Sequence, residues 1–398
     1  MSSNSTLKKA GSFLSERFRL IFFFLIDRLV PARKDYWAFA TWHGEYAHTI
    51  DNPRAVFELI KDDASIRKVL LRKRGQNPAT SVVEGTNVTV VNVESLRGAW
   101  LFARSKYLLL GYGLAGVCSY SRLLSRKHKV IQLWHGIPLK RIGKLFPGEP
   151  HWNQETPRYT ATVCSSERDQ EIMAAAFDPL NKHSVWLTGL PRNDTILKPE
   201  GELSADYKSQ LKRLRDALRG RRFILYAPTW RASENGIYAF SDAELDALRA
   251  TCSKHNAVFG IRAHANRRLR DNTSADPSSP IIFVNDYPDV NVLLRETDVL
   301  VTDYSSIYID FLITGRPILP FTYDVDSYVQ ERGFLYSLDE ALPAPCIRGF
   351  GDLLVHLEGA LRGALLSPQQ YAASKALFHS HADNAGAQVV AKIKALNN

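Results

Sequence analysis

The sequence predicts an α/β protein made of two successive halves, each with a parallel sheet covered by helices. Short buried strands alternate with helical patterns along the chain, and this alternation is typical of parallel sheets with helices on both faces. The series of strands breaks off near residue 200, at a basic helical segment, and then begins again. Two such halves predict two Rossmann-like domains that face each other across a cleft, with ligands beyond the carboxyl ends of the strands.

Length and composition agree with two folded domains. The chain has 398 residues, of which 45% are hydrophobic and 23% charged, so each half is long enough to bury a core. These proportions exclude a disordered, collagenous or multi-span membrane chain. The four cysteines lie far apart and form no CxxC pair, which argues against a disulfide scaffold and a structural zinc site and fits a reducing compartment.

The first domain is predicted to span residues 35–200. Its first strand, residues 36–42, leads into a loop at Gly44 and then a helix from about Asn52, where Pro53 suits the first helical turn. Further strands are predicted at residues 68–71, 87–91, 107–110 and 130–133. Helical patterns lie between several of these strands, as the crossovers of a parallel sheet require.

The second domain is predicted to span residues 201–398. A basic helix over residues 203–219 ends at Gly220, and a new series of strands follows it. These strands are predicted at residues 222–226, 257–261, 281–284, 299–302 and 317–320. Residues 271–280 are rich in Ser, Asp and Pro and are expected to form a surface loop.

The positive charge is concentrated at the N-terminus. The whole chain carries a formal charge of +10, and residues 1–34 supply half of it, with seven basic residues against two acidic ones. The apolar run over residues 20–26 is too short for a membrane span, which needs about 20 residues, and no small-residue cleavage site follows it. Apolar residues recur at helical spacing between the charged ones, which predicts a basic amphipathic helix that associates with a membrane. The alternative is an amphipathic helix packed on its own domain.

A histidine follows the predicted strand at residues 130–133. His135 and Gly136 come just after this strand, so the imidazole is expected to project into the cleft, where it is suited to take a proton from an attacking hydroxyl. Lys140 and Arg141 lie a few residues further on with no acid nearby, which favours a polyanionic ligand. The alternative for His135 is a core histidine bonded to a backbone group.

Two strand ends in the second domain carry further basic and hydroxyl groups. Arg262 and His264 follow one strand and lie on the same side if the backbone stays extended, so both can donate to phosphate oxygens. A surface pair after a strand is the alternative. Thr229 and Arg231 follow an earlier strand and are expected at the same rim.

A strand, a polar turn and a helix are predicted around Ser305 and Ser306. The segment reads VTDYSSIYIDF, with Thr302 at the end of the strand. Free amides and hydroxyls at a helix start form an anion site, so a pyrophosphate bound here needs no metal. Asp310 would repel a phosphate if it faced it, so it is expected to bind ribose or to act as a structural partner inside the helix. The alternative for the two serines is an ordinary helix cap.

Seven motifs occur in an order that resembles the CDP-glycerol glycerophosphotransferase family. They are QLWHGIPLK, TGLPRND, LYAPTWR, IRAH, VTDYSSIYIDF, GRPILPF and ERGF, and the resemblance covers roughly residues 36–380. Gly44 and Asn52 also look like parts of the family's first loop and helix. Two residues depart from the family pattern: Ile137 stands where a threonine is common, and Ala263 where a proline is usual. The resemblance implies a GT-B architecture, with an N-terminal acceptor domain and a C-terminal domain for a CDP-alcohol donor.

The resemblance also implies roles for single residues. His135 corresponds by motif position to the proposed general base, and Ser305 with Ser306 to the phosphate-binding turn. His264 and Arg262 correspond to a pair near the donor pyrophosphate. Residues predicted beside this pair are Thr302, Thr229, Arg231 and Asp310. Residues predicted to bind the acceptor or a phosphate group are Gly136, Lys140, Arg141, Gly44 and Asn52.

The expected reaction is transfer of glycerol phosphate, or a related polyol phosphate, from CDP-glycerol to a hydroxyl of a lipid-linked saccharide or a growing polyol phosphate chain. CMP is released, and neither a cofactor nor a metal is expected. The enzyme is expected to act as a peripheral protein at the cytoplasmic face of an anionic membrane, in teichoic acid or capsule synthesis. The alternative is a GT-B glycosyltransferase that uses a nucleotide-sugar. Nucleic acid is disfavoured as a partner because the basic residues do not interleave with exposed aromatic ones.

Overall fold

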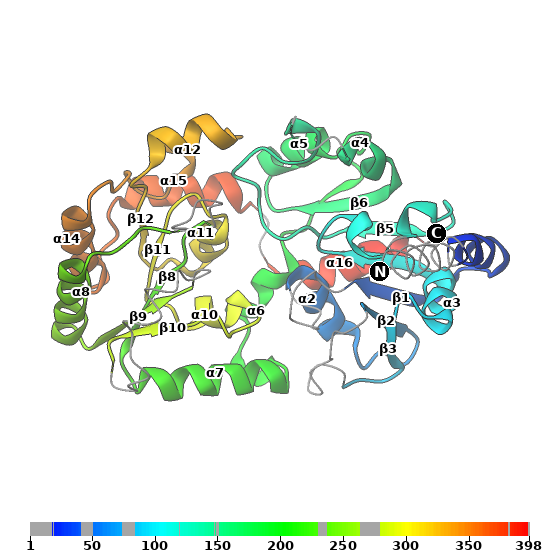
Figure 1. Ribbon diagram of the computed structural model, residues 1–398, viewed down its shortest axis with the longest axis horizontal. Helices are drawn as coiled ribbons and strands as arrows, with labels where there is room; N and C mark the ends of the chain where they lie inside the picture. The colour runs from blue at the N-terminus through cyan, green and yellow to red at the C-terminus, as the bar shows by residue number, and fades with distance from the viewer. Residues whose placement is uncertain are drawn as a thin grey trace, which may run out of the picture.

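The fold consists of two parallel sheets, each in its own half of the molecule (Figure 1). The N-terminal sheet has seven strands in the order β3-β2-β1-β4-β5-β6-β7, and the C-terminal sheet has five in the order β10-β9-β8-β11-β12. The predicted α/β class with parallel sheets is therefore confirmed. The computed structural model describes residues 18, 20–40, 51–73, 84–118, 120–146, 148, 151–229, 237–262, 279–380 and 383–396.

The N-terminal sheet is built around β1, whose central residues are buried on both faces. Trp37 pairs in parallel register with Lys68 of β2 and Tyr107 of β4, and Trp37 and Phe39 belong to the main core. The strands are β1 (Arg33–Ala40), β2 (Arg67–Arg72), β3 (Val88–Asn92), β4 (Ser105–Leu110), β5 (Lys129–Gln132), β6 (Tyr159–Cys164) and β7 (Val185–Leu187). Their helices are α2 (Asp51–Ile60), α3 (Leu96–Arg104), α4 (Trp152–Glu155), α5 (Glu167–Ala176) and α6 (Asp194–Leu197). Five of the seven strands were predicted, and β6 and β7 were not.

The C-terminal sheet contains the five strands that the sequence predicts for this half. They are β8 (Arg222–Tyr226), β9 (Ala257–Ile261), β10 (Ile281–Phe283), β11 (Val299–Thr302) and β12 (Ile318–Pro320). Local sequence fixes the helices as well: Ser241 and Glu244 form a reciprocal capping box at the start of α8. The helices of this half are α7 (Ala205–Leu218), α8 (Asp242–Lys254), α10 (Val290–Glu296), α11 (Ile307–Phe311), α12 (Val325–Arg332), α13 (Leu338–Ala341), α14 (Phe350–Ala360) and α15 (Pro368–Phe378).

The last helix, α16 (Ala385–Ala395), returns to the N-terminal half and lies beside α2 (Figure 1). The backbone amides of Ala385 and Gly386 donate to the carboxylate of Asp194, over 3.0 and 2.8 Å. The sequence assigned residues 201–398 to one domain, whereas α16 packs against the first half. This crossing helix joins the two halves at a second place besides the chain connection near residue 200.

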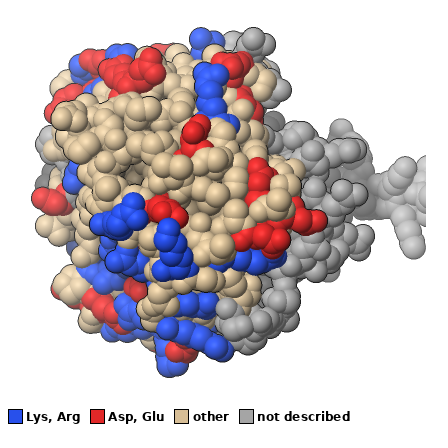
Figure 2. Space-filling view, turned by 90° about the vertical axis from the view of Figure 1, so that its left-hand side faces the viewer, with Lys and Arg blue, Asp and Glu red and all other residues tan. Residues whose placement is uncertain are grey.

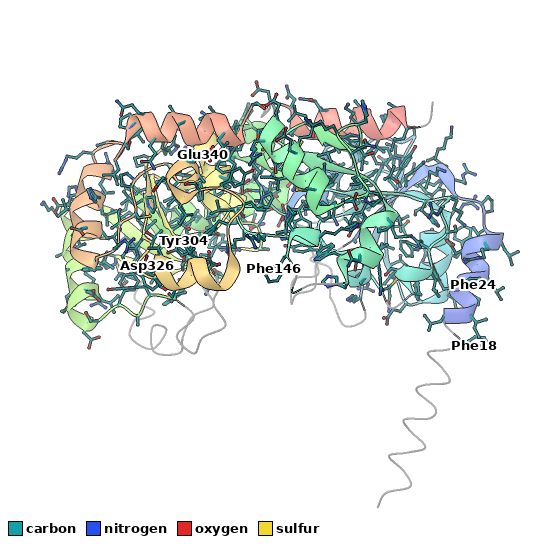
Figure 3. The ribbon with its side chains drawn as sticks, turned by 90° about the horizontal axis from the view of Figure 1, so that it is seen from above. Phe18, Phe24, Phe146, Tyr304, Asp326 and Glu340 are labelled. Atoms are coloured by element: carbon teal, nitrogen blue, oxygen red, sulfur yellow. The ribbon has the colours of Figure 1, made fainter. Side chains whose placement is uncertain are left out.

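An N-terminal helix over residues 20–29 packs on the N-terminal half through one face. Phe23 is fully buried and stacks on Tyr120, with ring centroids 3.9 Å apart, and Asp27 lies 2.6 Å from a ring nitrogen of His128. The opposite face is exposed, and Figure 3 shows Phe18 and Phe24 at the end of the molecule, away from the C-terminal half. The exposed apolar side chains of this face are Phe18, Ile21, Phe24, Leu25 and Leu29. Within the described ranges, no helix is long and apolar enough to cross a membrane.

The far end of the C-terminal half carries charges of both signs. Figure 2 shows basic and acidic patches side by side on this face. Exposed ion pairs connect some of them, as between Lys254 and Glu358, 2.9 Å apart, and between Arg348 and Asp326, 2.9 Å apart. Such exposed pairs contribute little to stability, about 0–1 kcal/mol each. Mixed charge of this kind does not favour a long polyanion as a partner of this face.

Candidate active site

A cavity of about 290 Å³ is lined by residues of both halves. From the N-terminal half come Asp51 at the start of α2, Tyr112 after β4, His135 after β5, and Arg192. The C-terminal half contributes loops that follow β8, β9, β10 and β11. Their lining residues are Ala227, Pro228, Arg262, Pro288, Asp289, Val290, Asn291, Ser305, Ser306, Ile307 and Asp310. The cavity thus lies beyond the carboxyl ends of parallel strands, where open α/β sheets bind ligands.

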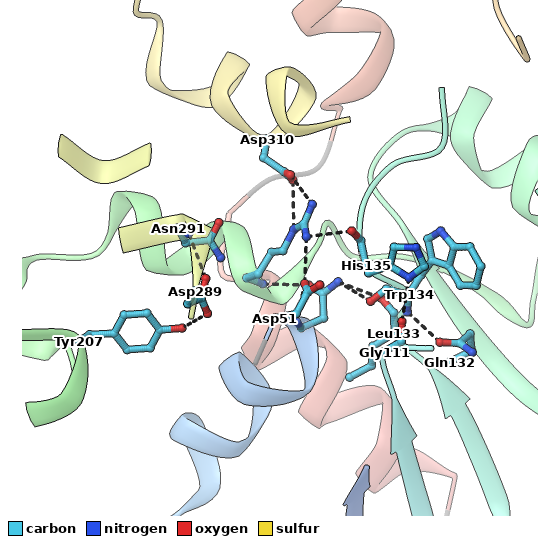
Figure 4. Close-up of polar contacts among 12 residues, drawn as sticks. Asp51, Gly111, Gln132, Leu133, Trp134, His135, Tyr207, Asp289, Asn291 and Asp310 are labelled. Carbon is cyan, nitrogen blue, oxygen red and sulfur yellow. Dashed lines mark hydrogen bonds and ion pairs between the residues drawn. The ribbon is translucent and has the colours of Figure 1, made fainter. Parts of the chain in front are cut away.

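His135 is held in one tautomer at the wall of this cavity. Its Nδ1 lies 3.0 Å from the carbonyl oxygen of Gly111 (Figure 4). A carbonyl oxygen only accepts, so Nδ1 carries the proton and Nε2 is the nitrogen able to accept one. The ring lies between Tyr112 and Trp134, with both centroid distances 4.3 Å. Burial lowers the pKa of His135, and the negative charge of Asp51 partly opposes this effect, so the imidazole is neutral at neutral pH.

The loop that presents His135 is fixed by Asn52, the second residue of α2. Both amide hydrogens of Asn52 are used, since Nδ2 donates to the carbonyl oxygens of Leu133 and Trp134, over 2.9 and 3.0 Å. These bonds hold Trp134 in the left-handed region, at φ +52°. Asn52 is completely buried, and its side-chain oxygen accepts from the backbone amide of Arg192. The structure therefore gives Asn52 a role in shaping the loop, whereas the sequence predicted contact with the acceptor or a phosphate.

Gly136 brings the His135 loop against the serine turn of the other half. Its φ is +145°, and a Cβ placed on it would lie 2.9 Å from Oγ of Ser306 and 3.0 Å from Nη2 of Arg192. A side chain at this position would strain the backbone and force the side chains of Ser306 and Arg192 to shift. Gly136 thus lies against the side chains of Ser306 and Arg192, and its binding of the acceptor or a phosphate group stays a prediction.

Arg192 is the centre of the charged network, and the sequence did not single it out beyond its place in the TGLPRND motif. Its Nη1 donates to Oδ1 of Asp51 over 3.0 Å and to the carbonyl oxygen of His135 over 2.9 Å. Its Nε and Nη2 both face the carboxylate of Asp310, on α11 of the opposite half (Figure 4). Burial raises the pKa of Asp310 to about 6, although Arg192 opposes the rise. Asp310 is thus the structural partner that the sequence allowed, with an arginine that it did not predict.

The serine turn lies at the cavity as predicted, but Thr302 does not. Ser305 and Ser306 line the cavity, and α11 begins at Ile307 with Ser306 as its N-cap residue. Thr302 is buried, and its hydroxyl donates to the carbonyl oxygen of Ala227 over 2.6 Å. Its side chain therefore fixes the loop after β8 and does not line the cavity.

Arg262 also lines the cavity. Its Nη1 donates to the carbonyl oxygens of Val284 and Tyr287, over 3.1 and 2.8 Å. These two bonds hold the guanidinium at the mouth of the loop that follows β10. A cation fixed by carbonyl oxygens keeps its charge for an anionic ligand.

A second cavity, of about 260 Å³, is lined by residues of the His135 loop and shares His135, Pro228, Ser305 and Ser306 with the first. Lys140 lines it, with Nζ 3.5 Å from Oγ1 of Thr229. Thr229 lines this cavity as well, while Arg141 is exposed and its backbone amide faces the carbonyl oxygen of Gly333 at 3.4 Å. The predicted basic segment therefore reaches the second cavity through Lys140.

Three predicted site residues, His264, Arg231 and Gly44, lie outside the described residues and remain predictions. Among the residues that are described, no group of three or more His, Cys, Asp or Glu side chains is placed to hold a metal ion. Site residues that sequence reasoning missed are Asp51, Tyr112, Arg192, Asp289 and Asn291. Tyr112 follows a predicted strand, and Asp51 follows the loop after another predicted strand. A polar side chain at such a position is the one sequence signal that could have indicated these two residues.

Fold and site together define an α/β protein of GT-B-like architecture with two parallel sheets and a cavity lined by residues of both halves. The chain belongs to the CDP-Glycerol:Poly(glycerophosphate) glycerophosphotransferase family, whose model matches residues 22–394. It is similar to the teichoic acid ribitol-phosphate polymerase TarK of Staphylococcus aureus, with 29% identity over 239 residues, 58% of this chain and 46% of TarK. It is also similar to the teichoic acid glycerol-phosphate transferase of Staphylococcus aureus, with 26% identity over 357 residues, 86% of this chain and 87% of the relative.

The fold matches that of solved structures as well. A variant of the wall teichoic acid polymerase TagF superposes with a TM-score of 0.77 and 22% identity, over 100% of both chains. This likeness shows a shared fold. The matched part of the chain spans less than half the length of TarK.

Proposed function

We propose that the protein transfers glycerol phosphate, or a related polyol phosphate, from CDP-glycerol to a hydroxyl of a lipid-linked saccharide or a growing polyol phosphate chain. The observation that carries this proposal is the position of His135, whose ring lines both cavities together with Ser305 and Ser306 and whose Nε2 is the nitrogen able to accept a proton. Membership of the glycerophosphotransferase family supports the donor, as does a solved TagF variant that was soaked with CDPG.

In the proposed reaction, the acceptor hydroxyl gives its proton to Nε2 of His135, and its oxygen attacks the β-phosphorus of CDP-glycerol. A new oxygen–phosphorus bond forms, the bridging bond to CMP breaks, and CMP takes the negative charge. A general base of this kind contributes about 10²- to 10⁴-fold. In this proposal, Arg262, Ser305 and Ser306, which line the first cavity, stabilise the charge on the phosphoryl oxygens, together with His264 as predicted from the sequence.

The two cavities supply separate places for the two substrates. The first is lined by Arg262 and the serine turn, which favours the donor there, in the domain over residues 201–398. The second is lined by Lys140 and apolar residues of the domain over residues 35–200, which favours the acceptor. We assign Lys140 to a phosphate of the acceptor chain, because an ammonium group is a suitable point charge for phosphate.

The same proposal includes peripheral attachment to the cytoplasmic face of an anionic membrane. The helix over residues 20–29 exposes four large apolar side chains and Arg28, and Phe18 just before it is exposed as well. Burial of each apolar side chain stabilises by about 2 kcal/mol, and each basic residue near an anionic surface adds about 1 kcal/mol. These contributions are sufficient for reversible docking near a lipid-linked acceptor.

Transfer assays with His135 variants test the proposed reaction. Labelled CDP-glycerol, CDP-ribitol and nucleotide-sugars are offered with a lipid-linked acceptor to the wild-type protein, His135→Ala and His135→Asn. We expect transfer from a CDP-alcohol only, with a loss of about 100-fold or more in both variants and unchanged donor binding. The matched control is His183→Ala, since His183 is exposed and lines neither cavity. Transfer of a sugar, or near-normal turnover without His135, would overturn the proposal.

A further inference from the structure

Two buried charges of opposite sign lie directly behind His135. Asp51 and Arg192 are 9% and 7% exposed, and they form an ion pair of 3.0 Å. Arg192 reaches the histidine through its backbone, because Nη1 donates to the carbonyl oxygen of His135 over 2.9 Å. Charges that are withdrawn from water act on a neighbouring ionisable group more strongly than exposed charges do.

The same guanidinium reaches the donor side of the cavity. Its Nε lies 3.4 Å from Oδ1 of Asp310, on the helix that follows Ser305 and Ser306. The Arg192 backbone amide is in turn held by Asn52 at the start of α2. One side chain therefore connects the start of α2, the His135 loop and α11 of the opposite half (Figure 4).

We propose that Asp51 and Arg192, a buried ion pair bonded to the backbone of His135, are positioning residues that hold the general base against the serine turn. The inference rests on the proposed function, in which His135 is the base. When His135 takes the proton of the acceptor hydroxyl on Nε2, the ring becomes positive. Asp51 stabilises that positive charge and Arg192 opposes it, so removing either partner changes the basicity of the ring.

The remaining charged groups around the cavity are already engaged. Asp310 faces Arg192, Asp289 accepts from the hydroxyl of Tyr207, and Arg262 donates to two carbonyl oxygens. For His135 itself, Asp51 raises the pKa and Arg192 lowers it, in addition to the lowering by burial. Asp51 and Arg192 are therefore the charged groups that act on the pKa of His135, and their signs differ.

The test is the pH profile of kcat/KM for Asp51→Asn and Arg192→Gln, measured with CDP-glycerol and a lipid-linked acceptor. The acid limb of this profile follows the pKa of the base in the free enzyme. Loss of the Asp51 charge lowers that pKa, so the limb moves to lower pH. Loss of the Arg192 charge raises it, so the limb moves to higher pH. We expect shifts of roughly half a pH unit or more in each direction.

A conservative test variant and two controls separate this effect from mere loss of structure. Asp51 has φ +67°, which asparagine adopts readily, so Asp51→Asn keeps both shape and backbone. Arg192→Lys keeps the charge and is expected to bring the limb back toward the wild-type position. Arg295→Gln should leave the limb unchanged, because Arg295 donates to carbonyl oxygens of residues 195, 196 and 198 and lines neither cavity.

The outcomes separate this inference from the proposed function. Two outcomes overturn the inference alone, provided that His135→Ala is inactive. In one, the acid limb moves in the same direction in both variants; in the other, it moves in neither. Full turnover by His135→Ala overturns the proposed function, and the inference with it. If Arg192→Gln does not fold, Asp51→Asn decides by itself, since an unmoved acid limb in that variant overturns the inference.

Discussion

Asn52 donates its side-chain amide to the carbonyl oxygen of Trp134, 3.0 Å away, and thereby fixes the residue just before His135. The same amide donates to Leu133, so two buried carbonyl oxygens depend on it. Local structure at the candidate base is therefore set by a helix that begins about eighty residues earlier in the chain.

Asn52→Ala is expected to lose turnover to a greater degree than stability. Two carbonyl oxygens and the backbone amide of Arg192 lose their partner, which costs roughly 1–3 kcal/mol for each buried group left unsatisfied, and the left-handed Trp134 is released. Denaturant unfolding and transfer assays measure the two effects. Asn153→Ala, at an exposed position of α4, is the control and should change neither. Wild-type turnover in Asn52→Ala would show that the loop holds His135 without this contact.

Gly136→Ala is expected to abolish transfer in a folded protein. The added Cβ would approach Ser306 to 2.9 Å and Arg192 to 3.0 Å, on a backbone at φ +145°. The collision pushes the His135 loop away from the serine turn, so the base and the proposed phosphate site separate. Gly359→Ala is the control, because no atom within 4 Å meets its Cβ. That helical site should gain up to about 1 kcal/mol in stability. Measured turnover close to wild type in Gly136→Ala would contradict the expected contact.

Asp169 is expected to make the protein less stable as the pH rises from about 4 to 7. This carboxyl is buried at the start of α5, and burial raises its pKa to about 7. A hydrogen bond donated by the backbone amide of Ser165 opposes this rise. The folded state then binds a proton that the unfolded state releases near pH 4, so stability is greatest at the acid end of this window and falls through pH 7. Each pKa unit corresponds to about 1.4 kcal/mol. The measurement is the free energy of unfolding in urea, for the wild type and for Asp169→Asn, at pH 5 and at pH 8.

In part of the same pH range, His379 changes the stability in the opposite direction. The quantity to compare is therefore the difference in unfolding free energy between the wild type and Asp169→Asn. Burial lowers the pKa of His379 to about 4, so its contribution is present above pH 6.5 and is lost as the pH falls toward 4. Asp169→Asn leaves His379 in place, and the subtraction removes its effect. Equal pH slopes in the two proteins would mean that Asp169 is ionised in the folded state at neutral pH.

The strands could be predicted where each is an apolar run between turn residues, which holds for the whole C-terminal sheet. Strand β6 was missed because Thr160 and Thr162 interrupt its apolar pattern. Their hydroxyls are used inside the sheet: Thr162 donates to the carbonyl oxygen of Gln132, and Thr160 accepts from the amide of Val130. Strand β7 has three residues, too few to show a period.

The site could be predicted where side chains follow strand ends, as His135, Arg262 and the serine turn do. The role of Arg192 could not be predicted, because its partners Asp51 and Asp310 lie 141 and 118 residues away in the chain. Thr302 shows the other limit. Its place at a strand end was evident, but the direction of its side chain depends on the pleat, which turns it toward Ala227.

Membrane attachment is best tested on the exposed face of the N-terminal helix. Removal of residues 1–30 would also remove Phe23 and Asp27, which are buried in the N-terminal half, and a buried Phe alone is worth about 3–5 kcal/mol. The double variant Phe24→Ser/Leu29→Ser keeps both residues and changes only exposed ones. We expect it to lose binding to phosphatidylglycerol vesicles, because about 2 kcal/mol of apolar burial is lost at each position, and to keep activity on a short water-soluble acceptor.

The control for this experiment changes the same kind of residue elsewhere. Leu197 and Val355 are 51% and 69% exposed, on α6 and α14, so Leu197→Ser/Val355→Ser removes equally exposed apolar surface away from the N-terminal helix. This variant should sediment with vesicles as the wild type does. If both double variants bind vesicles like the wild type, the helix over residues 20–29 is not the attachment site. If both lose binding, attachment depends on apolar surface in general and the helix has no special part in it.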